Sequence, residues 1–173
     1  MMIQNKLNKL LIFILPLFLA VFFAACSSGD KTNEEWQKDN DAIYEKIKNT
    51  SGWEALEANH MLYGGPEGVY IKVIEKGTET ESPFQTAQVK VNYMGYFLDD
   101  KNQTFDKGGM NVIFGVDKVV RGFGAALQQM HVGDKWEICI PYYLGYGTSA
   151  YSTIRGYSTL FFEVTLVEII QYP

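Results

Sequence analysis

The fold of this chain is decided between residues 89 and 164, where five short segments follow one another. They read V-K-V-N-Y-M-G (89–95), T-F-D (104–106), V-V-R-G-F-G-A-A-L-Q-Q-M-H-V-G-D-K (119–135), L-G-Y-G (144–147) and S-T-L-F-F-E-V (158–164). The first and last alternate like strands, whereas the apolar residues of the third recur at helical intervals and predict a helix over residues 122–130. Aromatic residues therefore gather around one short helix, and a small domain builds an apolar pocket with few polar groups at its mouth in this way.

Further strands are predicted on both sides of that helix. The alternation of residues 69–74 predicts a strand that ends near Gly77, and residues 136–140 and 160–170 alternate in the same way. Residues 98–102 read as a turn. Several strands with a single short helix indicate an α+β domain, in which a curled antiparallel sheet wraps around that helix.

The first 25 residues differ from all the rest. Lys6 and Lys9 are their only charged residues, and an apolar run from residue 10 to residue 25 follows. A basic start, a short apolar centre and small residues before a cut site are typical of a secretory signal. Cys26 then stands where a bacterial lipoprotein box has its lipidated cysteine, although Phe23 occupies the position of the usual Leu. We therefore expect a lipid anchor in the bacterial cell envelope, at the outer membrane, and a plain secreted protein is the alternative.

The charge balance argues against nucleic acid as a partner. The chain of 173 residues has a net charge of −5, and without residues 1–25 its 13 basic residues face 20 acidic ones, a balance of −7. No basic stripe is left to neutralise phosphates.

A second helix is expected between the signal and the sheet. Thr32 and Glu35 have capping-box spacing, and Trp36, Ile43 and Ile47 follow at helical intervals, which predicts a helix over residues 33–48. The helix could pack on the main domain or form a homodimer with a second copy. The expected organisation is a signal (1–25), a lipidated tether (26–32), a helical segment (33–65) and the main domain (66–173).

Most catalytic chemistry is not supported by the sequence. The two histidines, His60 and His131, have no further metal-ligating residues at the spacing of a metal site. The sequence has no nucleophile motif and no phosphate-binding glycine loop, and no cofactor is expected. Cys139 lies within an alternating strand and reads as a structural cysteine. Asp106 is the one carboxylate that stands out, with turn capping as its simpler role. An aromatic excess without a nucleophile or a metal site indicates an apolar binding site, or a reaction that needs only an apolar environment and no catalytic group.

The five segments, in this order and spacing, resemble the FKBP-type peptidyl-prolyl isomerases. The resemblance covers about residues 69–170, and it implies a five- to six-stranded antiparallel half-barrel around a short helix. It also implies prolyl cis–trans isomerisation of proline-containing polypeptides that fold in the envelope, and binding of macrolide ligands. The alternative is a binding module or holdase of the same fold with little turnover.

The resemblance assigns the site residue by residue. Phe123 would form the pocket floor and Val119 and Val120 a rim, and the N–H of Val120 and the hydroxyl of Tyr146 would bond ligand carbonyls. Asp106 would lie at the polar edge and Ile154 would close the far side. The aromatic walls would be Tyr93, Phe105 and Phe162, which can equally be read as core aromatics.

Four departures from the family pattern bear on that assignment. Phe123 stands where Trp is frequent, and Lys118 where an acidic residue is common. The bulge after Asp106 is short, with Met110 as a flexible substitute for its contacts. The loop over residues 148–157 lacks the family's Ile-Pro ending, which leaves the contact from Tyr151 open.

Overall fold

The computed structural model describes residues 31–56 and 68–171, all of which lie in the compact unit Lys31–Pro173. The signal and Cys26 fall outside the described residues. Within these ranges, no helix has both the length and the apolar character needed to cross a membrane.

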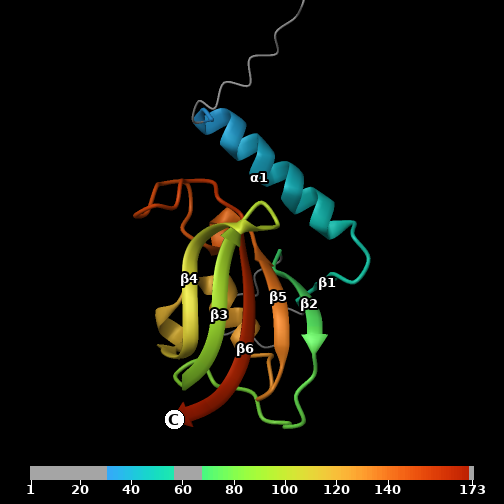
Figure 1. Cartoon of the computed structure of the whole chain (residues 1–173), viewed down its shortest axis with the longest axis vertical. Helices are drawn as coiled ribbons and strands as arrows, with labels where there is room; N and C mark the ends of the chain where they lie inside the picture. The colour runs from blue at the N-terminus through green and yellow to red at the C-terminus, as the bar shows by residue number, and fades with distance from the viewer. Residues whose placement is uncertain (1–30, 57–67, 172–173) are drawn as a thin grey trace, which may run out of the picture. The chain divides into compact units, whose positions relative to one another are not determined.

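A six-stranded antiparallel sheet forms the body of this unit (Figure 1). Its spatial order is β1-β2-β5-β6-β3-β4. The strands are β1 (Glu54–Ala55), β2 (Tyr70–Glu75), β3 (Gln88–Phe97), β4 (Asp100–Gly115), β5 (Lys135–Ile140) and β6 (Leu160–Gln171). The predicted α+β class with a curled antiparallel sheet is confirmed.

The helix α2 (Arg121–Leu127) lies against the inner face of this sheet, and its apolar side forms the main core with the strands. The helix ends three residues before the predicted bound, but Met130 is fully buried in the turn that follows. Two short 3₁₀ turns, η2 (Val116–Lys118) and η3 (Tyr142–Leu144), precede α2 and follow β5.

The predicted N-terminal helix is present as α1 (Asn33–Lys48), and its capping box forms as expected. The side chain of Thr32 accepts the backbone N–H of Glu35, and the Glu35 carboxylate accepts the backbone N–H of Thr32. Of the two placements that the sequence allowed, packing on the main domain is the one observed, because α1 places its apolar residues against the outer face of the sheet. Ile47 is buried there with Tyr96, Cys139 and Phe161, so the sheet carries a second core on its outer face.

Strand β4, of which only residues 104–106 stood out in the sequence, pairs regularly with β3 at its C-terminal end and is bulged in the part nearer the turn. Its 16 residues pair with ten on β3, with register shifts between residues 91 and 97 of β3. The turn that joins the two strands is tight, since Leu98 and Asp99 both adopt a positive φ of 54°. The bulges bend β4 and re-aim its side chains, and residues 105 and 106 lie in this bent part.

Candidate functional site

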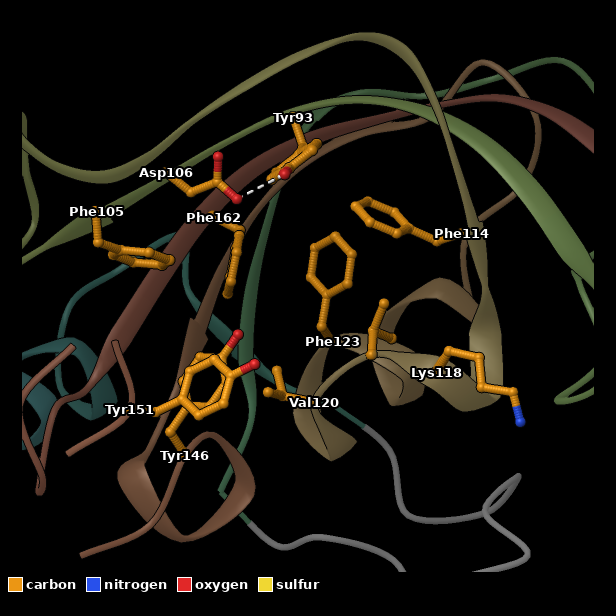
Figure 2. A pocket seen from close by; sticks show the side chains of 11 residues that line it. Tyr93, Phe105, Asp106, Phe114, Lys118, Val120, Phe123, Tyr146, Tyr151 and Phe162 are labelled. Atoms are coloured by element: carbon orange, nitrogen blue, oxygen red, sulfur yellow. Dashed lines mark hydrogen bonds between the residues drawn. The ribbon is translucent and has the colours of Figure 1, made fainter. Parts of the chain in front are cut away.

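Phe123 on α2 forms the floor of a pocket on the inner side of the sheet (Figure 2). Its side chain is 3 % exposed, and three aromatic rings surround it. The ring centroids of Phe162, Phe114 and Tyr93 lie 4.7, 6.4 and 6.5 Å away, at tilted or edge-on angles. Such offset geometries are the favourable ones for aromatic pairs, so the floor is a packed and fixed surface.

Phe105 supplies a side wall, and a glycine on the neighbouring strand makes room for it. The ring of Phe105 meets that of Phe162 edge-on at 5.4 Å. A Cβ atom at Gly95 would lie 2.5 Å from the Phe105 ring, a distance that real Cβ contacts do not show. The glycine that follows Tyr93 by two residues in the first sequence segment is therefore required by the position of Phe105.

One hydrogen bond dominates the polar edge of the pocket. The Tyr93 hydroxyl donates to Asp106 Oδ2 at 2.6 Å, and Asp106 Oδ1 accepts the backbone N–H of Gly108 at 2.8 Å. Burial, the hydrogen bond to Asp106 and the charge of that carboxylate all raise the pKa of Tyr93. The phenol therefore stays protonated and keeps donating at neutral pH. Asp106 serves both as a turn acceptor and as the polar edge, so its two predicted roles are compatible.

Tyr146 and Tyr151 lie together at the side of the mouth across from Tyr93 and Asp106 (Figure 2). Their rings are stacked, with centroids 4.7 Å apart and planes 8° apart. Burial raises the pKa of Tyr146, and the neighbouring Tyr151 and Asp106 act in the same direction. Its hydroxyl is therefore a protonated group at the mouth, able to donate to a ligand carbonyl.

Val119 and Val120 form the rim where the chain enters α2. Val120 is the N-cap residue, and its carbonyl accepts the N–H groups of Phe123 and Gly124 at 3.0 Å. This carbonyl satisfies two of the N–H groups at the start of the helix, which would otherwise lack an acceptor. The main chain at the rim is therefore held in place at the edge of the pocket.

The pocket has a volume of about 410 Å³, which suits a small apolar group with its flanking amides. Eleven residues line it: Tyr93, Phe105, Asp106, Phe114, Lys118, Val119, Val120, Phe123, Tyr146, Tyr151 and Phe162. No Ser or Cys is among them, and the part of the chain that the structure describes holds no group of ligands for a metal ion. The arrangement can bind an apolar group, exclude water from it and present a few hydrogen-bond donors to it.

The structure brings together most of the predicted site residues, with two exceptions. Ile154 is buried in the main core, where its backbone pairs with that of Tyr151, and it supports the mouth without lining it. Met110 was expected to replace missing contacts, but its side chain is 79 % exposed and borders a separate hollow near Lys107 and Glu163. The bulged course of β4 carries Met110 away from the pocket.

Sequence reasoning missed Phe114 as a lining residue and noted Lys118 only as a departure from the family. Phe114 follows Val112 by two residues in strand β4, and the exposed Ile113 lies between them, so the period of two carries the signal for Phe114. Lys118 is paired with its neighbour Asp117 at 2.7 Å and lies at the edge of the pocket. Nothing in the spacing of the sequence marks Lys118.

Comparison with known proteins agrees with this geometry. A family model described as FKBP-type peptidyl-prolyl cis-trans isomerase matches residues 79–167. The chain is 40 % identical over 126 residues to the FKBP-type 22 kDa peptidyl-prolyl cis-trans isomerase of Escherichia coli, covering 69 % of this chain and 60 % of that protein. It is 31 % identical over 144 residues to the outer membrane protein MIP of Legionella longbeachae, covering 81 % and 57 %. The chain thus spans about 60 % of the length of these two relatives.

A solved structure shares both the fold and the extent. The crystal structure of a peptidyl-prolyl cis-trans isomerase from Pseudomonas syringae superimposes with a TM-score of 0.68 and 27 % identity. The match covers 83 % of this chain and 99 % of that one.

Proposed function

Because the chain belongs to the FKBP-type peptidyl-prolyl cis-trans isomerase family, we propose that it accelerates the cis–trans isomerisation of X-Pro bonds and that the reaction takes place on the floor formed by Phe123. The observation that carries the proposal is the composition of the pocket. Seven aromatic side chains and two valines line it, and Asp106 and Lys118 are the remaining lining residues.

The physics of the reaction suits such a pocket. The barrier to rotation, about 18–20 kcal/mol, comes from amide resonance, which is lost when the C–N bond twists. A twisted amide carries less charge on its oxygen than a planar one, so it loses less free energy when it leaves water. An apolar pocket therefore binds the twisted state better than the planar state, and such differential binding is what lowers a barrier.

We assign the residues as follows. The proline ring rests on Phe123 between the walls formed by Tyr93, Phe105 and Phe162. The N–H of Val120 and the hydroxyl of Tyr146 bond the carbonyl groups that flank the twisting bond. Asp106 holds the Tyr93 ring through its 2.6 Å hydrogen bond, and no proton or covalent bond is exchanged with the substrate.

A protease-free assay with an X-Pro tetrapeptide panel tests this proposal. The full chain should accelerate isomerisation, and Phe123→Ala and Tyr146→Phe should each lower kcat/KM. For Tyr146→Phe the expected loss is roughly two- to tenfold, the effect of about one hydrogen bond. Tyr157→Phe removes a hydroxyl from the same loop outside the pocket and is the matched control. A folded parent without any acceleration would leave a non-catalytic binding module or holdase as the better reading.

We also propose a lipid anchor at Cys26 that places the enzyme in the bacterial envelope, at the outer membrane. The signal-like residues 1–25 and the name of the Legionella relative, an outer membrane protein, support this location. Labelling with a clickable fatty acid should modify the parent and spare Cys26→Ala. An unlabelled parent in the soluble fraction would favour the plain secreted protein.

The proposed substrates are proline-containing polypeptides that fold in the envelope, because uncatalysed proline isomerisation is slow enough to limit folding. Macrolide ligands of the family are expected to compete for the same pocket. A homodimer through α1 is the weaker alternative, since Trp36 and Ile47 of that helix are already buried against the sheet. Sedimentation analysis of the full chain in detergent distinguishes the monomer from the dimer.

A further inference from the structure

The N-terminal half of α1 contacts the segment that carries the two mouth tyrosines, residues 145–159, here termed the mouth loop. Trp36 of α1 is 8 % exposed, and its indole Nε1–H donates to Ser158 Oγ at 3.0 Å. The Ser158 hydroxyl in turn donates to the carbonyl of Arg155 at 2.6 Å. A side chain from the helix thus holds the C-terminal part of the loop through a buried hydrogen-bond chain.

Arg155 makes the reverse contact, from the mouth loop to the start of the helix. Its guanidinium donates to the carbonyl of Lys31 at 2.8 Å and to Asn33 Oδ1 at 2.7 Å. The same group lies over the Trp36 ring, 5.2 Å from its centroid. A planar guanidinium that both donates and stacks is oriented more strictly than a lysine ammonium would be.

Asn40 adds a third connection. It is fully buried within the helix, although Asn is a poor helix former. Both ends of its side-chain amide are hydrogen-bonded. Oδ1 accepts the N–H of Thr159 at 2.8 Å, and Nδ2 donates to the carbonyl of Trp36 at 2.8 Å. A buried amide is tolerated only when it is hydrogen-bonded, so this residue fits the loop in its present position.

The mouth loop itself is in a conformation that needs support. Ser152 and Tyr157 adopt positive φ angles of 53° and 61°, which are unfavourable for residues other than Gly. Internal bonds join Tyr151 to Ile154 in both directions and the N–H of Tyr157 to the carbonyl of Gly147. The loop is therefore a small folded unit, and its contacts with α1 hold it from behind while Tyr146 and Tyr151 face the pocket.

We propose that Trp36, Asn40 and Arg155 are positioning residues for the isomerase, which set the Tyr146–Tyr151 side of the pocket mouth through the mouth loop and so determine how tightly the residues flanking the proline are bound. The inference rests on the proposed function. The floor at Phe123 is carried by α2 and not by this loop, so the loop governs substrate binding more than the rate of the bound complex. Loosening the contact should raise KM with little change in kcat.

The test compares two substitutions on the same helix, each of which removes a hydrogen-bond donor and keeps an aromatic ring. Both are made in the full chain and measured with the protease-free assay. Trp36→Phe keeps a ring against Phe97, its edge-on neighbour at 5.3 Å, and removes the donor to Ser158. Tyr44→Phe removes the donor to the carbonyl of Gly68, at 2.9 Å, near the other end of α1. Both variants lose hydrogen bonding between α1 and the main domain, in Tyr44→Phe with Gly68 and with Tyr143, but only the Trp36 bond is made to the mouth loop.

Trp36→Phe is expected to raise KM about three- to tenfold, which is the effect of about one hydrogen bond on the loop. The differences in KM between tetrapeptides with different X residues should also become smaller. Tyr44→Phe should leave KM within twofold of the parent at a similar drop in Tm. Ser158→Ala removes the acceptor of the same bond and also the donor to the carbonyl of Arg155. The double variant should therefore raise KM by less than the product of the two single effects, because one bond is shared between them.

Two results would overturn the inference while the enzyme stays active. One is an unchanged KM in Trp36→Phe, and the other is an equal rise in both variants that follows their loss of Tm, which would mean a merely structural helix. A folded parent that does not accelerate isomerisation would remove the proposed function, and this inference with it.

Discussion

Two adjacent phenylalanines on β6 allow a direct test of where the reaction occurs. Phe162 faces the pocket and lies 4.7 Å from Phe123, whereas Phe161 is fully buried on the outer face, stacked on Tyr96 at 5.6 Å. The same substitution, Phe→Leu, can therefore be made at neighbouring positions that share a strand and differ only in the face to which they point.

The expected magnitude follows from the atoms removed. Leu has three side-chain carbons fewer than Phe, and each buried methylene contributes about 0.8 kcal/mol, so each variant should lose about 2 kcal/mol of unfolding free energy. For a domain of this size, such a loss lowers Tm by roughly 4–8 °C. In Phe162→Leu, part of the lost surface also contacts the proline ring, so kcat/KM should fall by up to about 30-fold. Phe161→Leu should keep kcat/KM within about threefold of the parent.

The assay is kcat/KM for one X-Pro tetrapeptide, measured well below the Tm of both variants, together with thermal unfolding. The pair separates a loss of the site from a loss of stability, because both variants are destabilised alike. If both lost kcat/KM equally, or if Phe162→Leu kept the activity of the parent, the assignment of the reaction to the Phe123 floor would be refuted.

Two further predictions concern the scaffold. The hydrogen bonds from Lys101 and Lys135 lower the pKa of Glu163 in the folded state, so ionised Glu163 stabilises the fold. This contribution is fully present above the unfolded pKa of about 4.3 and is lost as pH falls through the folded pKa. The urea midpoint of Glu163→Gln should therefore fall less than that of the parent between pH 7 and pH 3.5, and equal falls would contradict the pairing. Gly108 has a φ of +63°, and its Cβ would lie 1.7 Å from a backbone carbonyl oxygen, so Gly108→Ala should cost more than roughly 3 kcal/mol. Gly147→Ala, with a φ of +79° and open space, should cost about 1 kcal/mol, and equal costs measured by urea unfolding would exclude the steric explanation.

The sequence predicted best what depends on a short repeat. The period of two predicted that Val89, Val91 and Tyr93 share one face, and they do, on the side of the main core; the capping box predicted the start of α1 at its observed residue. It predicted less well what depends on where distant segments meet. The bulges of β4 carry Met110 away from the pocket, and they arise from pairing with β3 and not from the residues of the β4 segment alone.

The outer core was the larger omission, and its signal was present in the sequence. Where an antiparallel sheet has one wet face, its strands alternate between apolar and polar residues. The strands here alternate in that way over Glu163 to Leu166, but they are apolar at successive positions over residues 138–140 and 160–162. Consecutive apolar residues require a cover on both faces of the sheet.

The register shows how these runs define the place where α1 docks. Tyr96, Phe161 and Cys139 are direct neighbours across β3, β6 and β5, so they form one apolar row across the outer face. The next outward row contains Glu163 and Glu137, which form ion pairs with Lys135 and Lys101. The apolar side of α1 buries Ile47 against this row. The row lies at the end of the sheet where residue 160 begins β6, directly after the mouth loop. The helix therefore covers the apolar row and reaches the mouth loop in the same placement, because Asn40 in the middle of α1 already bonds Thr159, the residue that joins the loop to β6.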